Sequence, residues 1–192
     1  MKKKIDNEKI IHATIDLATQ QGLLNVSLNG IAANLGIKTP SLYNHISGIE
    51  DLYGQLGIYS LDLLEKEVVQ SVLGFSKHDA LIRIANTYVT FAIQNPVLYQ
   101  AIENPYLNNS QDISKAKEAI VLIIQSVLKV YNFTIEKEIK IIRVLRSYLH
   151  GFASLYIADL FNIKTVDVAE SFDLGLDALL SGLGLDWLKS LG

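Results

Sequence analysis

The sequence predicts an all-α protein, with a small helical domain at the N-terminus and a larger one behind it. Apolar residues recur at steps of three and four along most of the chain, as at Ile142, Leu145 and Leu149. No segment sustains the alternation with a period of two that a strand requires. Hydrophobic residues make up 49% of the chain, and its mean hydropathy is +0.25. In a chain of 192 residues, this composition predicts an internal pocket or a large subunit interface in addition to an ordinary core.

The first two predicted helices are bounded by clear start and stop signals. The first covers 7–21 and ends at Gly22. The second opens at Ser27, a small hydroxyl residue that can cap its N-terminus, and it ends at Gly36. Glycine suits that end because it accepts the left-handed backbone conformation that a C-terminal cap needs.

A short polar helix is expected next. Thr39 is the expected N-cap, and Pro40 takes the first helical position, where a missing N–H costs little. Leu42 is its one apolar anchor, and the side chains around Leu42 can all form hydrogen bonds. This combination suits a helix that lies in the major groove of DNA. The alternative is a helix-turn-helix that serves protein packing alone.

Six further helices are predicted, over 49–72, 79–94, 96–103, 112–131, 135–160 and 165–183. Asn-Pro pairs stop two of them, and the segment 105–111 is the most loop-like of the chain. The helix over 135–160 is apolar on two faces and therefore needs two packing partners. We divide the chain near the start of the helix over 49–72, into a domain at 1–52 and a domain at 53–192.

The net charge of −3 conceals a difference between the two ends of the chain. Residues 1–46 hold five lysines against three acids, a net charge of +2, whereas the rest of the chain carries −5. A basic DNA-binding head on an acidic body has this asymmetry, although a lysine-rich start also serves simply to solvate a terminus. Lys2, Lys3 and Lys4 form a basic arm that either touches DNA or is frayed.

The composition argues against several other classes of protein. There is no cysteine, which excludes disulfides, thiol catalysis and thiolate zinc sites and fits a cytoplasmic location. The four histidines are scattered, and neither a P-loop nor an H-E-x-x-H or G-x-S-x-G motif occurs. We therefore expect no metal site, no cofactor and no enzyme. No apolar run approaches the roughly 18–20 residues of a membrane span, and the start MKKKID lacks the apolar segment of a signal peptide.

The segment G-I-K-T-P-S-L-Y-N-H-I, at residues 36–46, resembles the recognition-helix signature of TetR-type transcriptional regulators. Residues 7–55 fit the whole N-terminal domain of that family. Two positions depart from the family pattern. Ile46 stands where an aromatic residue is usual, and Ile49 stands where the family usually has a lysine that contacts a backbone phosphate.

The resemblance implies a DNA contact for the polar residues of this region. Thr39, Pro40 and Ser41 match the family positions that face base edges, and Tyr43 and His45 match positions that hold phosphates. The full set of expected DNA-binding residues is Ser27, Lys38, Thr39, Pro40, Ser41, Tyr43, Asn44 and His45.

The last two long helices resemble the dimerisation pair of the same family, two copies of which make a four-helix bundle. His150-Gly151 also resembles a C-terminal domain type with a Trp-His-Gly signature, with Leu149 in place of the tryptophan. A ligand pocket is expected between the helices of the C-terminal domain, and any one of its expected residues is alternatively an ordinary core group. The expected ligand-binding residues are Tyr88, Phe91, Tyr99, Gln125, Arg146, Tyr148 and His150.

These observations together predict a homodimeric, ligand-responsive transcriptional regulator. We expect a repressor that binds a pseudo-palindromic operator in double-stranded DNA and leaves it when a small, mainly apolar effector binds. The two recognition helices of the dimer would enter successive major grooves, about 34–36 Å apart. Two alternatives stay open: a small helical enzyme or carrier with a vestigial helix-turn-helix, and a constitutive DNA-binding protein with a filled core.

Overall fold

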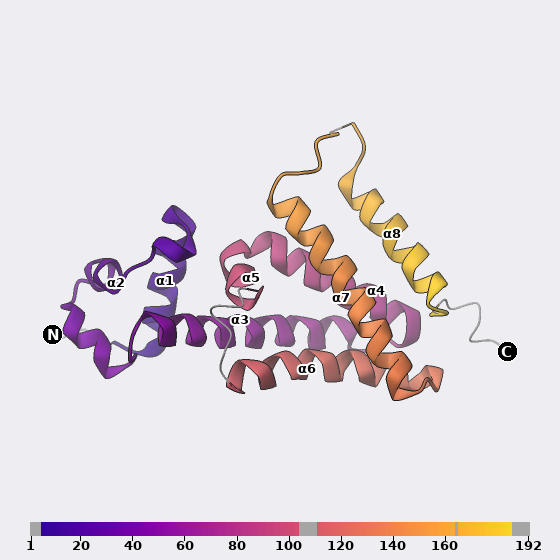
Figure 1. The fold of residues 1–192 in the computed structure, drawn as a ribbon, viewed down its shortest axis with the longest axis horizontal. Coiled ribbons are helices and arrows are strands. Elements are labelled where there is room, and N and C mark those ends of the chain that lie inside the picture. The colour runs from indigo at the N-terminus through magenta and orange to yellow at the C-terminus, as the bar shows by residue number, and fades with distance from the viewer. Residues whose placement is uncertain (1–4, 104–110, 164, 186–192) are drawn as a thin grey trace. The chain divides into compact units, whose positions relative to one another are not determined.

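All regular secondary structure in the described part of the chain is helical. The computed structural model describes residues 5–103, 111–163 and 165–185. Within them lie eight α-helices and three 3-10 helices (Figure 1), which confirms the all-α class. The chain divides into two compact units. Unit 1 comprises Met1–Leu63 with Asn95–Ala116, and unit 2 comprises Leu64–Gln94 with Lys117–Gly192.

The order of the elements agrees closely with the predicted order. They are α1 (Asn7–Gln21), η1 (Leu23–Asn25), α2 (Leu28–Leu35), η2 (Thr39–Asn44), α3 (Ile49–Val72), α4 (Lys77–Gln94), α5 (Pro96–Glu103), α6 (Gln111–Leu128), η4 (Lys129–Tyr131), α7 (Ile135–Ile157) and α8 (Val168–Gly182). Helices α3 and α6 contribute residues to both units. None of the helices in the described ranges is long and apolar enough to cross a lipid bilayer.

The core of unit 1 is built by α1, α2, η2 and the first turns of α3. Ile31 of α2 and Leu42 of η2 are completely buried in it. Both predicted caps of α2 are confirmed. The Ser27 hydroxyl accepts the backbone N–H of Gly30 at 3.2 Å, and Gly36 ends the helix in the left-handed region at φ 69°. The helix-turn-helix is therefore set by local capping and by one shared apolar core.

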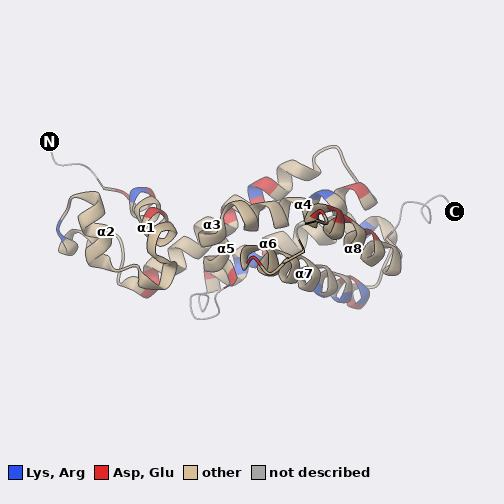
Figure 2. Ribbon diagram, turned by 90° about the horizontal axis from the view of Figure 1, so that it is seen from above, with Lys and Arg blue, Asp and Glu red and all other residues tan. Residues whose placement is uncertain are grey.

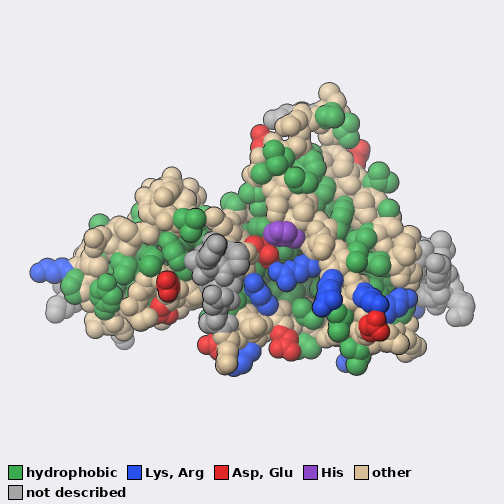
Figure 3. Space-filling view, viewed as in Figure 1, with side chains coloured by type: hydrophobic (Ala, Val, Ile, Leu, Met, Phe, Trp, Pro, Cys, Tyr) green, Lys and Arg blue, Asp and Glu red, His purple; other side chains and the backbone are tan. Residues whose placement is uncertain are grey.

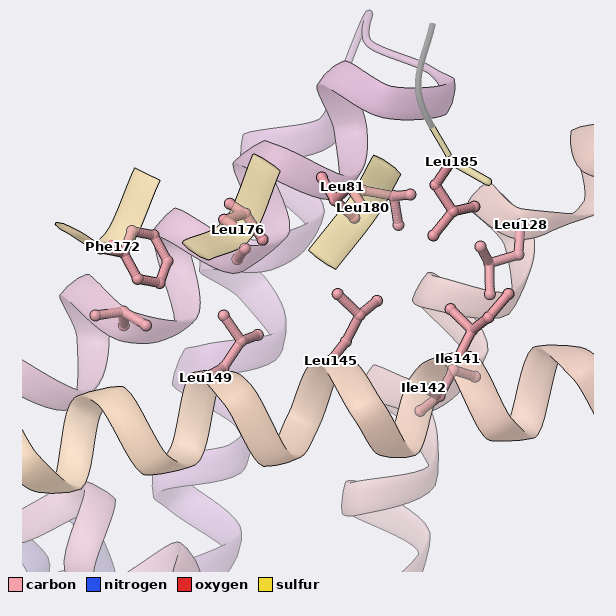
Figure 4. Close-up of a cluster of buried hydrophobic side chains, with 12 residues drawn as sticks. Leu81, Leu128, Ile141, Ile142, Leu145, Leu149, Phe172, Leu176, Leu180 and Leu185 are labelled. Atoms are coloured by element: carbon pink, nitrogen blue, oxygen red, sulfur yellow. The ribbon is translucent and has the colours of Figure 1, made fainter. Parts of the chain in front are cut away.

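The core of unit 2 lies between α4, α7 and α8. Figure 4 shows Leu145 and Leu149 of α7 pointing toward α8, which buries Phe172, Leu176 and Leu180 against them. Side chains of α4 complete this cluster. Helix α7 thus uses one apolar face for packing within its own unit, as the three-and-four spacing of its leucines predicted.

The end of α8 is fixed to the rest of unit 2 through one carbonyl. The Leu185 side chain is fully buried, and its backbone oxygen accepts the Tyr131 hydroxyl at 3.2 Å. Nδ1 of His78 lies 3.1 Å from the same oxygen. These contacts tie the segment after α8 to α4 and to η4.

The prediction that Thr39 caps the polar helix was wrong. Lys38 occupies the N-cap position without a side-chain cap, and Thr39 is the first helical residue. The Thr39 hydroxyl instead donates to Oδ1 of Asn29 at 2.8 Å. The helix is also a 3-10 helix of six residues, a form that is common in short connectors.

Several helix ends in unit 2 also differ from the predicted ones. Helix α7 ends at Ile157, before a turn in which Asp159 takes a positive φ of 52°. Helix α8 begins at Val168, because the Asp167 carboxylate caps it by accepting the Ala169 N–H at 2.8 Å. The predicted helix over 112–131 keeps its α form only to Leu128 and ends as η4.

Two expectations fall outside the described residues. These are the basic arm at Lys2, Lys3 and Lys4 and the predicted loop as far as residue 110. Gln111, the last residue of that loop as predicted, is the first residue of α6.

Candidate nucleic-acid interface

The polar helix η2 is anchored in the core of unit 1 by apolar side chains, while several of its polar side chains are exposed. Leu42 is completely buried and Ile46 is 2% exposed, so the two side chains anchor the helix and the turn behind it. Ile46 therefore does the packing at the position where the family usually has an aromatic residue. The Tyr43 side chain is 57% exposed, and Lys38 and Asn44 are exposed as well.

All eight residues predicted to bind DNA lie in unit 1, in the α2–η2 segment. Besides the three just named, Ser27 and Pro40 are exposed, and Thr39, Ser41 and His45 are half-buried. A short helix has no structural need for so many outward polar groups around a single apolar anchor. The arrangement offers donors and acceptors on one side of η2, as groove recognition requires.

The Thr39 hydroxyl has only part of its hydrogen-bonding capacity free. Its single hydrogen goes to Oδ1 of Asn29 on α2. The oxygen lone pairs are left, so Thr39 can still accept a hydrogen bond from a donor group. In the major groove such donors are the amino groups of adenine and cytosine. Sequence reasoning missed Asn29 because ten positions separate it from Thr39.

The His45 ring is held by a chain of side-chain amides. Its Nδ1 lies 2.9 Å from Oδ1 of Asn7 at the start of α1. Nδ2 of Asn7 donates to Oε1 of Gln55 on α3 at 3.3 Å, and Nε2 of Gln55 donates to the His45 carbonyl at 3.4 Å. Because Oδ1 of Asn7 can only accept, Nδ1 of His45 donates to it. The second ring nitrogen, Nε2, takes no part in this network. A phosphate oxygen also only accepts, so Nε2 can contact one only when it carries a hydrogen of its own.

The start of α3 is fixed by a carboxylate. Oδ2 of Asp51 accepts the backbone N–H of Ser47 at 2.7 Å and the Ser47 hydroxyl at 3.1 Å. The backbone hydrogen bond from Ser47 holds the pKa of Asp51 below its usual value. Gln55 also donates to this carboxylate, at 3.2 Å. The network therefore links the turn after η2 to the helix that follows.

Replacing Asn7 by alanine should weaken DNA binding, because the His45 ring is then no longer held in place. The Asn7→Ala variant loses the acceptor that fixes the ring, and we expect affinity for an operator duplex to fall about two- to tenfold. Fluorescence anisotropy with a labelled duplex measures this loss. In a His45→Ala background the same change should have little further effect. An equal loss in both backgrounds would show that Asn7 acts independently of the ring.

The seven residues predicted to line a ligand pocket belong to both units. Tyr99 is buried in α5 of unit 1, while the other six belong to unit 2. Phe91 is buried in α4, and Arg146 is exposed on α7. Tyr88, Gln125, Tyr148 and His150 are half-buried. Their role in ligand binding stays a prediction.

Unit 2 has a half-open groove of about 580 Å³ at another place. It lies between α4, the last turns of α7, the connection to α8 and the first turns of α8. None of the seven predicted residues lines it, although Tyr148 packs against Phe152 and Phe172, which do. Sequence reasoning missed this groove because its walls come from segments far apart in the chain.

A metal centre has no support in the described ranges, where no group of three or more His, Asp or Glu side chains is placed to hold an ion. The polar groups that converge around η2 and the start of α3 are amides, hydroxyls, one imidazole and the single carboxylate of Asp51. These are groups that contact nucleic acid, and they lack the clustered carboxylates or imidazoles of a metal site.

Comparison with known proteins agrees with this interpretation. Residues 10–56 match the domain family described as "Bacterial regulatory proteins, tetR family", and residues 81–179 match "Tetracyclin repressor-like, C-terminal domain". The uncharacterized HTH-type transcriptional regulator YobS of Bacillus subtilis (strain 168) is 31% identical over 180 residues, which cover 93% of each chain.

Solved structures show the same fold at low sequence identity. A protein of unknown function from Rhodococcus sp. RHA1 has a TM-score of 0.78 at 17% identity, over 94% of this chain and 97% of the other. The TetR variant Q116A from Acinetobacter baumannii AYE, in complex with minocycline, has a TM-score of 0.68 at 16% identity, over 94% and 97%. With a relative of 31% identity along nearly its whole length, the chain belongs to the TetR family of helix-turn-helix transcriptional regulators, which are not enzymes.

Proposed function

We propose that the protein is a homodimeric repressor that leaves its operator when a small, mainly apolar effector binds in unit 2. The observation that carries this proposal is the exposed polar side of η2 above the buried Leu42. The repressor would act in the cytoplasm, on double-stranded DNA with a pseudo-palindromic sequence. Helix α3 contributes residues to both units, and we propose that the effector acts on DNA binding through it.

Within this proposal, the residues of η2 have different tasks. Thr39, Pro40 and Ser41 read base edges, and Thr39 does so as an acceptor. Tyr43 and His45 hold phosphates, with Nε2 of His45 directed by the Asn7 amide. Lys38 and Asn44 add contacts at either end, and Ser27 adds a phosphate contact to its capping role. Phosphate contacts fix the register of the protein, and base contacts set the sequence preference.

Exposed apolar side chains on α7 and α8 support the homodimer. Val144 and Leu155 on α7 are 40% and 44% exposed, and Leu174 on α8 is 74% exposed. Exposed large apolar groups on two adjoining helices are typical of a subunit interface. Membership of the Trp-His-Gly subtype, which rests on His150 and Gly151, stays a prediction.

The charges on the same two helices support this pairing as well. Figure 2 marks Lys and Arg positions in blue on the ribbon of α7, and Figure 3 shows basic side chains on this part of the surface. Three of them, Lys140, Arg143 and Arg146, are exposed, whereas α8 exposes Glu170 and Asp177. A basic α7 of one copy meeting an acidic α8 of its partner would favour the four-helix bundle over other arrangements.

The effector is proposed by analogy and by composition. A TetR variant with this fold was solved in complex with minocycline, a small organic molecule. The high hydrophobic content of this chain favours a ligand with a large apolar part. The predicted ligand residues, such as Tyr88, Gln125 and His150, belong to this proposal.

Two substitutions in η2 should separate positioning from base recognition. Tyr43→Ala removes a phosphate contact and should weaken binding to all duplexes by a similar factor. Ser41→Ala should change the base preference and leave affinity for unrelated DNA nearly constant. Selection of bound duplexes from a random library, followed by affinity measurements at several salt concentrations, distinguishes the two effects. Unchanged operator affinity in both variants would contradict the proposed docking of η2.

The same selection tests the proposed function as a whole. The bound duplexes should contain two related half-sites, with centres about 34–36 Å apart. Affinity for DNA upstream of the protein's own gene should fall steeply as salt rises, because phosphate contacts release counterions. If no duplex is enriched even at low salt, the proposed operator binding is wrong.

A further inference from the structure

The groove in unit 2 has an unusual combination of side chains. Its volume of about 580 Å³ lies in the range of small-molecule sites. One wall comes from α4, with Val89, Thr90 and Ile93. The opposite wall comes from the end of α7, the connection that follows and the start of α8. The groove lies within a single unit, because all of its described lining residues belong to unit 2.

Aromatic rings form much of the groove. The rings of Phe152 and Phe161 have centroids 4.9 Å apart at an angle of 37°. Phe152 and Phe172 are also 4.9 Å apart, in a T-shaped arrangement. Tyr156 lines the same space, one turn after Phe152 on α7. The face of an aromatic ring carries partial negative charge, so a site with several rings attracts a cation that has an apolar body.

Two carboxylates line the groove beside these rings. Asp167 uses Oδ1 to cap α8 and keeps its second oxygen for other contacts. Asp159 follows α7 in a turn whose backbone is fixed by its N–H bond to the Tyr156 carbonyl at 3.0 Å. Among the described residues that line the groove, none is Lys, Arg or His, and Lys164 of the connection lies outside the described residues. The described walls therefore carry negative charge without a balancing positive side chain.

This charge decides among the classes of ligand. A purely apolar molecule would remove water from two carboxylates without replacing its hydrogen bonds, which is costly. An anion would be repelled by both of them. An organic cation can place its charge beside Asp159 and Asp167 and its apolar body against the rings.

We propose that this groove binds organic cations with an aromatic or aliphatic body. The further claim that such a cation is the effector rests on the proposed function, whereas the binding itself does not. The groove would then refine the mainly apolar effector into one that carries a positive charge. It also places the effector among residues other than the seven that the sequence indicated.

Three probes of one shape test the charge preference. Benzyltrimethylammonium is the cation, neopentylbenzene is its uncharged carbon isostere, and phenylmethanesulfonate is an anion of similar outline. Saturation-transfer NMR on the full chain measures binding of each probe. We expect the cation to bind roughly tenfold more tightly than the neutral isostere, and the anion not to bind. Equal binding of the cation and the neutral probe, binding of the anion, or no binding of the cation would overturn the proposal.

Substitutions that keep the fold then locate the site. Asp159→Asn is compatible with the positive φ of this residue, because asparagine adopts that conformation readily. Asp167→Asn keeps an N-capping residue at the start of α8. Each should lower affinity for benzyltrimethylammonium roughly three- to tenfold. Asp62→Asn, on an exposed part of α3 outside the groove, is the matched control and should leave it unchanged. Equal losses in all three variants, or none, would contradict this location.

Different results would contradict the proposed repressor function and the proposed cation site. If the cation binds in the groove and operator affinity stays constant, the groove is a cation site and its effector role in the proposed function is wrong. If a duplex is bound and released by other compounds while the cation does not bind, the repressor stands and the inference about the groove fails.

Discussion

Leu42→Ala should destabilise unit 1 by about 2–5 kcal/mol, the usual cost of emptying a fully buried leucine site. Leu42 is a side chain that anchors η2 in the core of unit 1. Its removal should therefore also abolish specific DNA binding, although no outward polar group is changed. Urea denaturation measures the loss of stability, and amide hydrogen exchange should report it in α1, α2 and η2.

The same chemical change at an exposed leucine is the control. Leu24 in η1 also belongs to unit 1, and its side chain is 67% exposed. Leu24→Ala should change stability by less than about 0.5 kcal/mol and leave DNA binding intact. If Leu42→Ala keeps full operator affinity, then η2 does not act as a fixed platform, and the proposed docking is contradicted.

Gly175→Ala should destabilise unit 2 by roughly 1–3 kcal/mol, although alanine normally stabilises a helix relative to glycine. A Cβ atom at Gly175 would overlap the Tyr148 hydroxyl and would lie 2.9 Å from Cζ of that ring. The ring cannot easily move away, because it packs on Phe172 and its hydroxyl donates to the Phe172 carbonyl at 2.7 Å. Burial, with a further contribution from the negative charge of Asp173, raises the pKa of Tyr148.

Two comparisons make this prediction specific. Gly182→Ala, on the same helix, meets no neighbouring atom within 4 Å and should be neutral or stabilising. In a Tyr148→Leu background, Gly175→Ala should destabilise unit 2 much less, because the ring atoms that the new Cβ would overlap are absent. Thermal unfolding followed by circular dichroism measures all four variants. A similar loss with and without the tyrosine ring would mean that the close contact is not the cause.

Helix positions were largely predictable because the signals that set them are local. A glycine in the left-handed conformation at Gly36 and a hydroxyl cap at Ser27 act within a few residues of the ends they define. The apolar spacing of α7 likewise follows from the helix repeat alone. The prediction went wrong at Thr39, where a partner on another helix outcompeted the local cap.

The sequence by itself determined the helical class, the order of the helices and the polar character of the segment that we propose reads DNA. Each of these depends on residues that are neighbours along the chain. Only the tertiary structure decided which nitrogen of His45 is held by the protein, since the Asn7 amide that holds the ring lies 38 positions away. The tertiary structure also decided where the groove of unit 2 lies. A groove between α4, α7 and α8 depends on how side chains from distant parts of the chain pack together. A local sequence pattern does not predict such packing.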